Sequence, residues 1–199
     1  GATAIAFIPS RQDDGYGLNI KMINEINIQG IKLIITVDNG ISAFDAIKRS
    51  NQLGIDLIIT DHHKIPNYSL NIYALLHPEQ SPYNSPFKYL AGVGIAYVLA
   101  NNICKKINYD INKTTANALF CIGTIADMAP LIGANRKWLK EYVKTGGTVF
   151  INTHLLENAE RLCDRAAIIH QGKIQSLITL KDLRKQDLTL EELFHEIVK

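Results

Sequence analysis

Cysteine is scarce in this sequence, and its few copies do not suggest pairing. The three cysteines, Cys104, Cys121 and Cys163, are odd in number and show no CxxC spacing. A disulfide framework needs paired cysteines and a zinc knuckle needs closely spaced ones, so the sequence predicts neither. This usage is typical of a reducing compartment, and we expect a cytoplasmic protein.

Charge of one sign and long apolar runs are lacking as well. A formal net charge of +2 gives no overall field that attracts nucleic acid, so any contact with a polyanion has to be local. The longest apolar stretch, residues 90–100, is too short to cross a bilayer, and residues 1–5 lack the basic region of a signal peptide. We therefore expect no membrane segment and no export signal.

The size and composition are those of a globular protein. The 199 residues, 47% of them hydrophobic, suffice for one sizeable domain or for one domain with an appendage. Residues 4–8 have the apolar pattern of a strand already under way, and the first residue is Gly1 rather than Met, so we interpret the chain as a fragment. In the turn-rich loop that follows, Arg11 is a candidate for binding a phosphate; a solvated arginine beside acidic residues is the alternative.

Two isoleucine-rich segments, residues 30–40 and 54–61, have closely similar sequences. Residues 42–52 between the two carry apolar side chains at helical spacing, so the pattern predicts a strand, a helix and a second strand. Such units are right-handed and place the two strands parallel in one sheet, with their carboxyl ends at the same edge. The sequence therefore predicts an α/β fold with a parallel sheet.

Metal-capable side chains follow both of these strands. Asp38 comes after the first strand, and Asp61, His62 and His63 come after the second, so all four are expected at one edge of the sheet. Carboxylates mixed with imidazoles suit Mn²⁺ or Mg²⁺, and a set that contains histidine also suits Zn²⁺. Taken alone, an aspartate after a strand is more often a helix cap, and a histidine pair occurs by chance on loops. Their coincidence at one edge favours a metal site.

A second source of carboxylate lies further along the chain. The sequence predicts helices at residues 19–27, 90–107 and 115–126 and a short strand at residues 72–76. The helix at residues 115–126 is apolar nearly all round, so we expect it to be buried. It ends at Asp127, and a carboxylate at the end of a buried helix needs a partner, for which a metal ion is one candidate.

Short motifs of turn-forming and metal-binding residues occur along residues 1–140. In order they are Pro9-Ser10-Arg11 with Gly15-Tyr16-Gly17, Thr36-Val37-Asp38-Asn39-Gly40, Thr60-Asp61-His62-His63, Leu90-Ala91-Gly92-Val93-Gly94, residues 123–131 and Asn135-Arg136. Their order and spacing resemble the catalytic domain of the RecJ-like single-strand-specific exonucleases, a family of the DHH phosphoesterase superfamily.

The resemblance implies an activity and a substrate. It implies a parallel-sheet DHH-type domain that acts as a two-metal phosphodiesterase with Mn²⁺ or Mg²⁺. The implied reaction removes nucleotides from the 5′ end of single-stranded DNA, with Arg11 and Arg136 as substrate-binding residues. A short oligonucleotide or a cyclic dinucleotide remains possible as substrate, because relatives in the superfamily share these motifs.

The resemblance also implies a role for each side chain of the cluster. It assigns Asp38 to a position that bridges the metals, and His62 and Asp127 to positions as further ligands. His63 is implied to face the substrate phosphate. Asp61 is implied to support the cluster, where a carboxylate can fix the tautomer of an imidazole.

One part of the family's pattern is missing. An Asp-rich loop that supplies further metal ligands normally precedes the stretch at residues 4–9, and the chain starts after it. We therefore expect an incomplete two-metal site, weakened metal binding and impaired activity. The family's downstream nucleic-acid-binding domain is missing from the sequence as well.

From about residue 142 the sequence changes character. Residues 148–174 and the tail that follows resemble the carboxyl-terminal end of an ABC transporter ATP-binding subunit, and this resemblance makes His154 the switch histidine that contacts the γ-phosphate. However, no GxxxxGK[ST] loop, Walker B strand or signature loop occurs in the 199 residues, so we expect no ATP binding. The pattern predicts strands at residues 148–152 and 166–170 and helices at residues 155–164 and 189–198.

Asparagine usage changes near the same point, since asparagine is common up to Asn135 and occurs only twice afterwards. We interpret the chain as a chimera of a partial DHH domain, residues 1–140, and a small α/β segment, residues 141–199. Three hypotheses follow: an impaired RecJ-like exonuclease, a fragment of an ABC-type ATP-binding subunit, and an inactive chimera of the two. Because each part evolved to pack against elements that the sequence lacks, we also expect exposed apolar patches.

Overall fold

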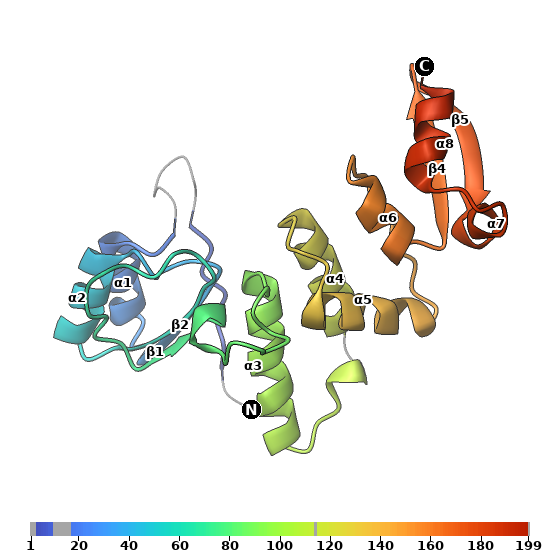
Figure 1. Cartoon of the computed structure of the whole chain (residues 1–199). Coiled ribbons are helices and arrows are strands. Elements are labelled where there is room, and N and C mark those ends of the chain that lie inside the picture. Colours follow the sequence, from blue (N-terminus) through green and yellow to red (C-terminus); the bar gives the residue numbers. More distant parts are fainter. Residues whose placement is uncertain (1–2, 10–16, 114, 199) are drawn as a thin grey trace. The chain divides into compact units, whose positions relative to one another are not determined.

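The computed structural model describes residues 3–9, 17–113 and 115–198 (Figure 1). Two compact units divide the chain, unit 1 (Gly1–Gly147) and unit 2 (Thr148–Lys199), and each contains its own hydrophobic core. The boundary expected between residues 140 and 141 lies inside helix α5 (Gly133–Lys144), which belongs to unit 1. No helix in these described ranges is long and apolar enough to cross a membrane.

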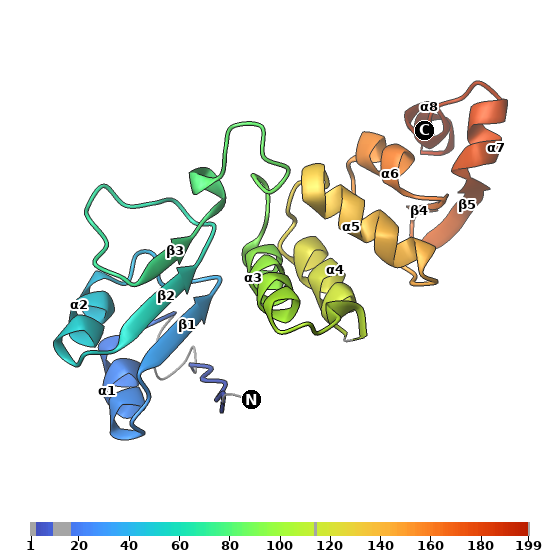
Figure 2. The ribbon, with the colours of Figure 1, turned by 90° about the horizontal axis from the view of Figure 1, so that it is seen from below.

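Unit 1 contains a parallel sheet with the strand order β1-β2-β3 (Figure 2). The strands are β1 (Leu33–Val37), β2 (Asp56–Thr60) and β3 (Ala74–Leu76). The register pairs Val37 with Thr60 and Thr60 with Leu76, so the three strands end at the same level. The predicted α/β fold with a parallel sheet is thus confirmed, and the residues that follow each strand emerge at one edge.

Helices α1 (Ile20–Ile28) and α2 (Phe44–Gln52) pack on one face of this sheet. Asn19 begins α1, because its side-chain oxygen accepts a hydrogen bond from the Met22 N–H, one of the unpaired donors of the first turn. The core of this layer combines apolar side chains from both helices and from β2. Its most deeply buried members are Ile23, Ile41, Ala46, Ile47, Ile55, Leu57 and Ile59.

Three helices follow the sheet: α3 (Gly92–Lys106), α4 (Ala116–Ala126) and α5. One aromatic side chain from each, Tyr97, Phe120 and Trp138, forms a cluster with ring centroids 5.0 to 5.4 Å apart. Edge-to-face contacts of this kind add to the burial of apolar area, and they hold the three helices together. Two short 3₁₀ turns, η1 (Pro78–Gln80) and η2 (Ile111–Lys113), lie in the connections.

The expectation that the helix at residues 115–126 is buried all round is wrong. Leu119 and Ile122 of α4 are 58% and 66% exposed, whereas Phe120, Cys121 and Thr124 on the opposite face are buried. The helix therefore packs against α3 and α5 along one side and leaves an apolar side open. A helix this apolar offered no polar face in the sequence from which to predict the open side.

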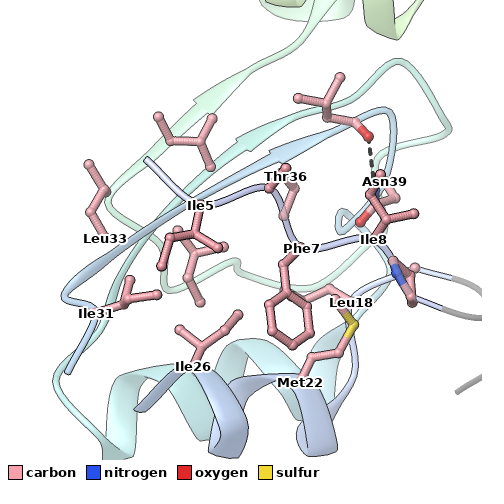
Figure 3. Close-up of a pocket in the computed structure, with 16 residues that line it drawn as sticks. Ile5, Phe7, Ile8, Leu18, Met22, Ile26, Ile31, Leu33, Thr36 and Asn39 are labelled. Atoms are coloured by element: carbon pink, nitrogen blue, oxygen red, sulfur yellow. Dashed lines mark hydrogen bonds between the residues drawn. The ribbon is translucent and has the colours of Figure 1, made fainter. Parts of the chain in front are cut away.

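Residues 3–9 form no strand, which contradicts the strand expected at residues 4–8. A cavity of about 430 Å³ lies between this segment, α1 and β1, the edge strand of the described sheet, although the Phe7 side chain packs against the core (Figure 3). A strand needs a neighbouring strand that pairs with its backbone groups, and across the cavity the segment has none. Leu33, Ile35 and Val37 of β1 remain 44% to 48% exposed, in line with the expected apolar patches.

Unit 2 is a two-stranded antiparallel sheet with three helices. Its core consists of Ile168, Leu180, Leu183 and Leu190. The strand expected at residues 148–152 is absent, because this segment is coil in the structure. The other three predicted elements are present, and a second strand and a further helix accompany them. The elements are α6 (Leu156–Leu162), β4 (Arg165–His170), β5 (Lys173–Thr179), α7 (Leu180–Lys185) and α8 (Leu190–Ile197).

Candidate metal centre

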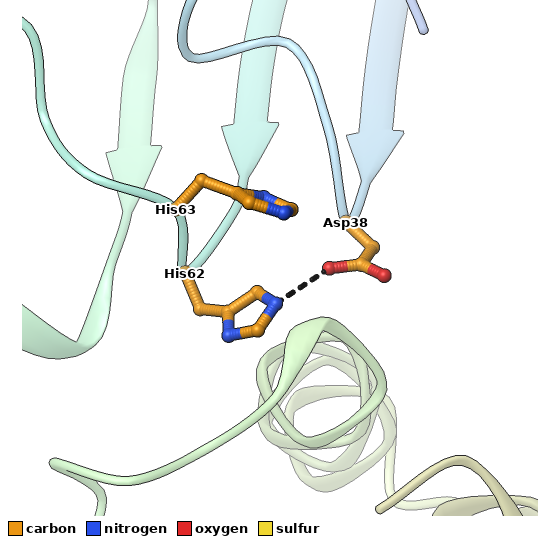
Figure 4. A group of neighbouring side chains, drawn as sticks. All are labelled: Asp38, His62 and His63. Atoms are coloured by element: carbon orange, nitrogen blue, oxygen red, sulfur yellow. Dashed lines mark ion pairs between the residues drawn. The ribbon is translucent and has the colours of Figure 1, made fainter. Parts of the chain in front are cut away.

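The carboxyl ends of β1 and β2 bring the predicted side chains to one edge of the sheet (Figure 4). A backbone hydrogen bond joins the first residue of the loop after each strand to the last residue of the neighbouring strand. The Asp38 N–H donates to the Thr60 carbonyl at 2.9 Å, and the Asp61 N–H donates to the Leu76 carbonyl at 3.3 Å. The side chains on these two loops therefore start from fixed backbone positions.

His62 lies beside two carboxylates. Its Nε2 is 3.0 Å from Asp38 Oδ1 and 3.8 Å from Asp127 Oδ2. Asp127 arrives from the carboxyl end of α4, where its backbone caps the helix. His63 completes the group, because one ligand atom from each of Asp38, His62 and His63 lies within 4.8 Å of the others.

Asp38 Oδ1 is buried and makes no hydrogen bond in the part of the chain that the structure describes. Its approach to His62 Nε2 at 3.0 Å is short, yet the angles do not make a hydrogen bond. Neighbouring ligands of one octahedral ion, each 2.0–2.1 Å from it, are about 3 Å apart. A buried oxygen without a hydrogen bond, beside an imidazole nitrogen at this spacing, fits a divalent ion held between the two.

The backbone and the packing at Asp38 are both unusual. Its φ of 63° lies in the left-handed region, which non-glycine residues adopt at a cost of about 1–3 kcal/mol. α3 begins directly beside it, because a Cβ at Gly92 would lie 2.4 Å from Asp38 Cβ. Glycine at this position lets the start of α3 reach the carboxylate, and the positive end of the helix dipole favours the charged form there.

Burial and the neighbouring side chains together work against a charged Asp38. Burial raises the pKa of Asp38 above its usual value; His62 lowers it in part, and the nearby charge of Asp127 raises it further. Two ionised carboxylates this close repel each other. A bound cation would offset both the burial of Asp38 and this repulsion, because its positive charge stabilises the ionised forms.

Asp61 has a different role, because it is almost completely buried and its oxygens are fully used. Oδ1 accepts hydrogen bonds from the His62 N–H at 2.8 Å and the His63 N–H at 3.1 Å, and Oδ2 accepts from the Ile41 N–H at 3.1 Å. Burial alone raises the pKa of Asp61, but the hydrogen bonds from His63 and Ile41 outweigh it, so the pKa lies below its usual value. Asp61 is therefore an ionised anchor that holds the loop after β2.

Asp61 also fixes the ring of His63. His63 Nδ1 lies 2.6 Å from Asp61 Oδ1, so Nδ1 carries the hydrogen and Nε2 is the free ring nitrogen. The hydrogen bond to Asp61 raises the pKa of His63, and burial opposes this only in part. The His63 side chain is 52% exposed, so this ring can meet a ligand from solvent.

Three further residues were predicted to bind substrate or nucleotide. Arg11 falls outside the described residues. Arg136 is half-buried in the first turn of α5, and its role with a substrate stays a prediction. His154 is exposed in unit 2, ahead of α6. Sequence reasoning missed the contact of Gly92 with Asp38, and it did not single out His77, a buried histidine directly after β3.

Part of the chain is similar to a second kind of protein. The ABC-type transporter ATP-binding protein EcsA of Bacillus subtilis is 38% identical over 72 residues, which cover 34% of this chain and 29% of that protein. This match is shorter than the one that follows, which extends over 130 residues. It is consistent with the ABC-like pattern expected for the tail and shows no more than a partial similarity.

Longer matches connect the chain with another family. The single-stranded-DNA-specific exonuclease RecJ of Bacillus subtilis is 42% identical over 130 residues, which cover 65% of this chain and 16% of that protein. A crystal structure of exonuclease RecJ bound to manganese matches with a TM-score of 0.60 and 30% identity, over 69% of this chain and 34% of that one. The chain thus spans a minor part of these relatives. Residues 1–124 match the N-terminal domain of the DHH family, and the chain belongs to that family.

Proposed function

We propose that unit 1 is the metal-binding part of a phosphodiesterase that acts on single-stranded DNA and uses Mn²⁺ or Mg²⁺. One observation carries the proposal: Asp38 Oδ1 is buried without a hydrogen bond, 3.0 Å from His62 Nε2. Asp127 adds a second carboxylate at 3.8 Å from the same nitrogen. The RecJ relatives named above support the substrate class, and the manganese in the solved RecJ structure supports the metal.

In this proposal each side chain has a distinct task. Asp38, His62 and Asp127 hold the cation, which supplies Lewis-acid stabilisation of the phosphoryl charge when it is bound. His63 donates a hydrogen bond from Nε2 to a phosphate oxygen, and its raised pKa keeps more of the ring protonated near neutral pH. Asp61 keeps Nδ1 protonated and the ring oriented.

The direction and size of the substrate are further parts of the proposal. We infer 5′-to-3′ removal of nucleotides, with Arg11 and Arg136 on the phosphates, from the family's motifs. A two-ion site needs more donors than the side chains that converge in the described residues. We therefore expect the 199 residues alone to bind one ion, with weakened affinity, and to cleave single-stranded DNA slowly.

Titration calorimetry with Mn²⁺ on the full chain tests the metal site, with His62→Ala as the site variant and His154→Ala as the matched control in unit 2. We expect micromolar binding that His62→Ala removes and His154→Ala leaves unchanged. Release of nucleotides from a 5′-labelled single strand should follow the same order. Equal binding by all three proteins, or no binding by any, contradicts the proposal.

For unit 2 we propose an origin in the carboxyl-terminal segment of an ABC transporter ATP-binding subunit, which makes the chain a chimera. The similarity to EcsA supports this origin. Because the sequence contains no phosphate-binding GxxxxGK[ST] loop, we propose that His154 has no nucleotide to contact. Titration with ATP and Mg²⁺ should give no heat of binding, and saturable binding lost in His154→Ala would restore the ATP-binding hypothesis.

A further inference from the structure

His77 is a buried histidine at the same edge of the sheet as the candidate metal centre. It follows β3 directly and begins the short 3₁₀ turn η1, and it is only 7% exposed. β3 pairs in parallel with β2, so its carboxyl end lies beside the loop that carries His62 and His63. The backbone of the two loops is also joined directly through the hydrogen bond from Asp61 to Leu76.

The hydrogen bonds of His77 define its tautomer. The Glu79 N–H donates to His77 Nδ1 at 3.1 Å, and a backbone amide can only donate, so Nδ1 carries a lone pair. His77 Nε2 lies 2.7 Å from the His63 carbonyl oxygen, which can only accept. The ring is therefore neutral with its hydrogen on Nε2. Both nitrogens are in use, which leaves His77 no atom to offer to a metal or a substrate.

These contacts complete a clamp around His63. The His63 N–H and Nδ1 are held by Asp61 Oδ1, and the His63 carbonyl is held by His77. With both ends of the residue fixed, the ring of His63 keeps its place beside His62, at a centroid distance of 4.7 Å. Loss of either contact frees the backbone of an exposed loop residue, and the ring then samples other positions.

We infer that His77 is a positioning residue, which acts through His63 and touches neither metal nor substrate. The inference rests on the proposed function of the site, because it assigns to His63 the contact with the phosphate. In its narrowest form, the Nε2–H of a neutral His77 holds the His63 carbonyl so that the His63 ring faces the bound phosphodiester.

Two substitutions separate the two contacts of His77. In His77→Asn, the side-chain oxygen can replace Nδ1 as acceptor for the Glu79 N–H, but the shorter side chain cannot reach the His63 carbonyl. In His77→Gln, the longer amide can supply the donor at the position of Nε2. His154→Asn in unit 2 serves as the control for replacing a histidine by asparagine at an exposed position.

Turnover of a 5′-labelled single strand at saturating Mn²⁺ is the first readout. We expect His77→Asn to lower kcat about tenfold while the Kd for Mn²⁺ changes by less than about twofold, since the side chain acts on a neighbour of the ligands. His77→Gln should restore most of the turnover, and His154→Asn should match the wild type. If both His77 variants lose activity only in proportion to a loss of folded protein, His77 has a structural role and the inference is wrong.

Amide hydrogen exchange at His62 and His63, measured by NMR on the metal-free full chain, is the second readout and needs no activity. Both amides donate to Asp61 Oδ1, so they report on the clamp. We expect faster exchange at these two amides in His77→Asn and wild-type protection in His77→Gln. If the wild-type chain has no nuclease activity, the proposed function is wrong. The hydrogen-exchange measurement still shows whether His77 holds His63 in place. Unchanged protection in His77→Asn overturns the inference.

Discussion

At the scale of one residue, Asp38 combines several features that destabilise the folded protein. It holds a left-handed backbone, a buried oxygen without a hydrogen bond and a raised pKa, all next to a second carboxylate. None of these features stabilises the metal-free protein. In the function proposed above, a bound cation would give the buried oxygen a partner and stabilise both carboxylates, so these costs to the fold support that proposal.

We predict that Asp38→Asn abolishes Mn²⁺ binding and stabilises the metal-free chain. The folded-state pKa of Asp38 is raised, so the cost of its charge is fully present above that pKa and disappears below the unfolded value of 3.8. Asparagine also tolerates the left-handed backbone. Because the side chain is 41% exposed, the gain at neutral pH is at most about 1 kcal/mol.

Urea unfolding in the presence of a chelator measures this gain. The difference between Asp38→Asn and the wild type should shrink as the pH falls from neutral through the raised folded pKa of Asp38 to its unfolded value of 3.8. A variant that is less stable than the wild type at neutral pH contradicts this view of Asp38.

A second prediction at this scale concerns Asp61→Asn. One amide oxygen cannot serve the backbone donors of Ile41, His62 and His63 together with the ring of His63, and its NH₂ group meets a donor instead. We expect a loss of about 2–4 kcal/mol in the free energy of unfolding at neutral pH. The lowered pKa of Asp61 means that its contribution is present above 3.8 and is lost as the pH falls through the folded value.

The pKa of His63 is shifted in the opposite direction to the pKa of Asp61. Because it is raised, the His63–Asp61 pair contributes fully below the unfolded value of 6.5, and this contribution is lost as the pH rises through the folded pKa. NMR titration of the metal-free chain should show the His63 pKa above its usual value in the wild type and lower in Asp61→Asn. An unchanged His63 pKa in the variant shows that the Asp61 contact is not formed in solution.

At the scale of elements, the start of α3 sets the shape of the site. A Cβ at Gly92 would lie 2.4 Å from Asp38 Cβ and 2.5 Å from Asp38 Oδ1, inside any real contact distance. We therefore predict that Gly92→Ala moves α3 away from β1 and weakens Mn²⁺ binding by a factor of about 10 to 100.

Gly94→Ala is the matched control on the same helix. Its Cβ meets the end of the flexible Leu90 side chain, with Leu90 Cδ2 at 2.8 Å, so the neighbour can move without disturbing Asp38. Calorimetric titration should give wild-type Mn²⁺ affinity for Gly94→Ala and weak binding for Gly92→Ala. Equal affinities in the two variants show that α3 does not constrain Asp38.

The helices and strands also show which parts of the fold could be predicted from the sequence alone. The unit formed by β1, α2 and β2 was predictable because its strands are continuous isoleucine-rich runs and its helix repeats apolar residues at helical spacing. The segments at residues 4–8 and 148–152 are also mostly apolar but have no paired neighbour in the described residues, and strand propensity depends on such partners. Composition cannot show whether a partner is present.

The residues of the candidate site also differ in how well the sequence predicted them. Asp38, Asp61, His62 and His63 were predictable because each directly follows a strand of one parallel unit. Asp127 was a weaker prediction, since it depends on where α4 ends. His77 was missed, although a histidine between the end of a strand and a proline is a signal that marks the sheet edge. Its role depends on a hydrogen bond across 14 positions, which no local pattern encodes.

At the scale of the whole molecule, the two units have separate cores of unequal size. Unit 2 has 52 residues and a small core around Leu183, and domains of this size bury too little apolar surface for high stability. We therefore predict that the chain does not unfold in one sharp transition. Calorimetry should show two transitions, and Mn²⁺ should raise the temperature of only one of them, because only unit 1 carries the candidate ligands.

Trp138 assigns the transitions, because it is the single tryptophan and packs against Phe120 and Tyr97 in unit 1. Its emission wavelength should follow the transition that Mn²⁺ shifts, whereas far-UV circular dichroism follows both. At a concentration of Mn²⁺ a hundred times its Kd, binding stabilises unit 1 by about 2.7 kcal/mol, which moves its midpoint by several degrees. Coincident transitions by both probes, raised together by Mn²⁺, would instead mean that the joined sequences fold as one cooperative domain.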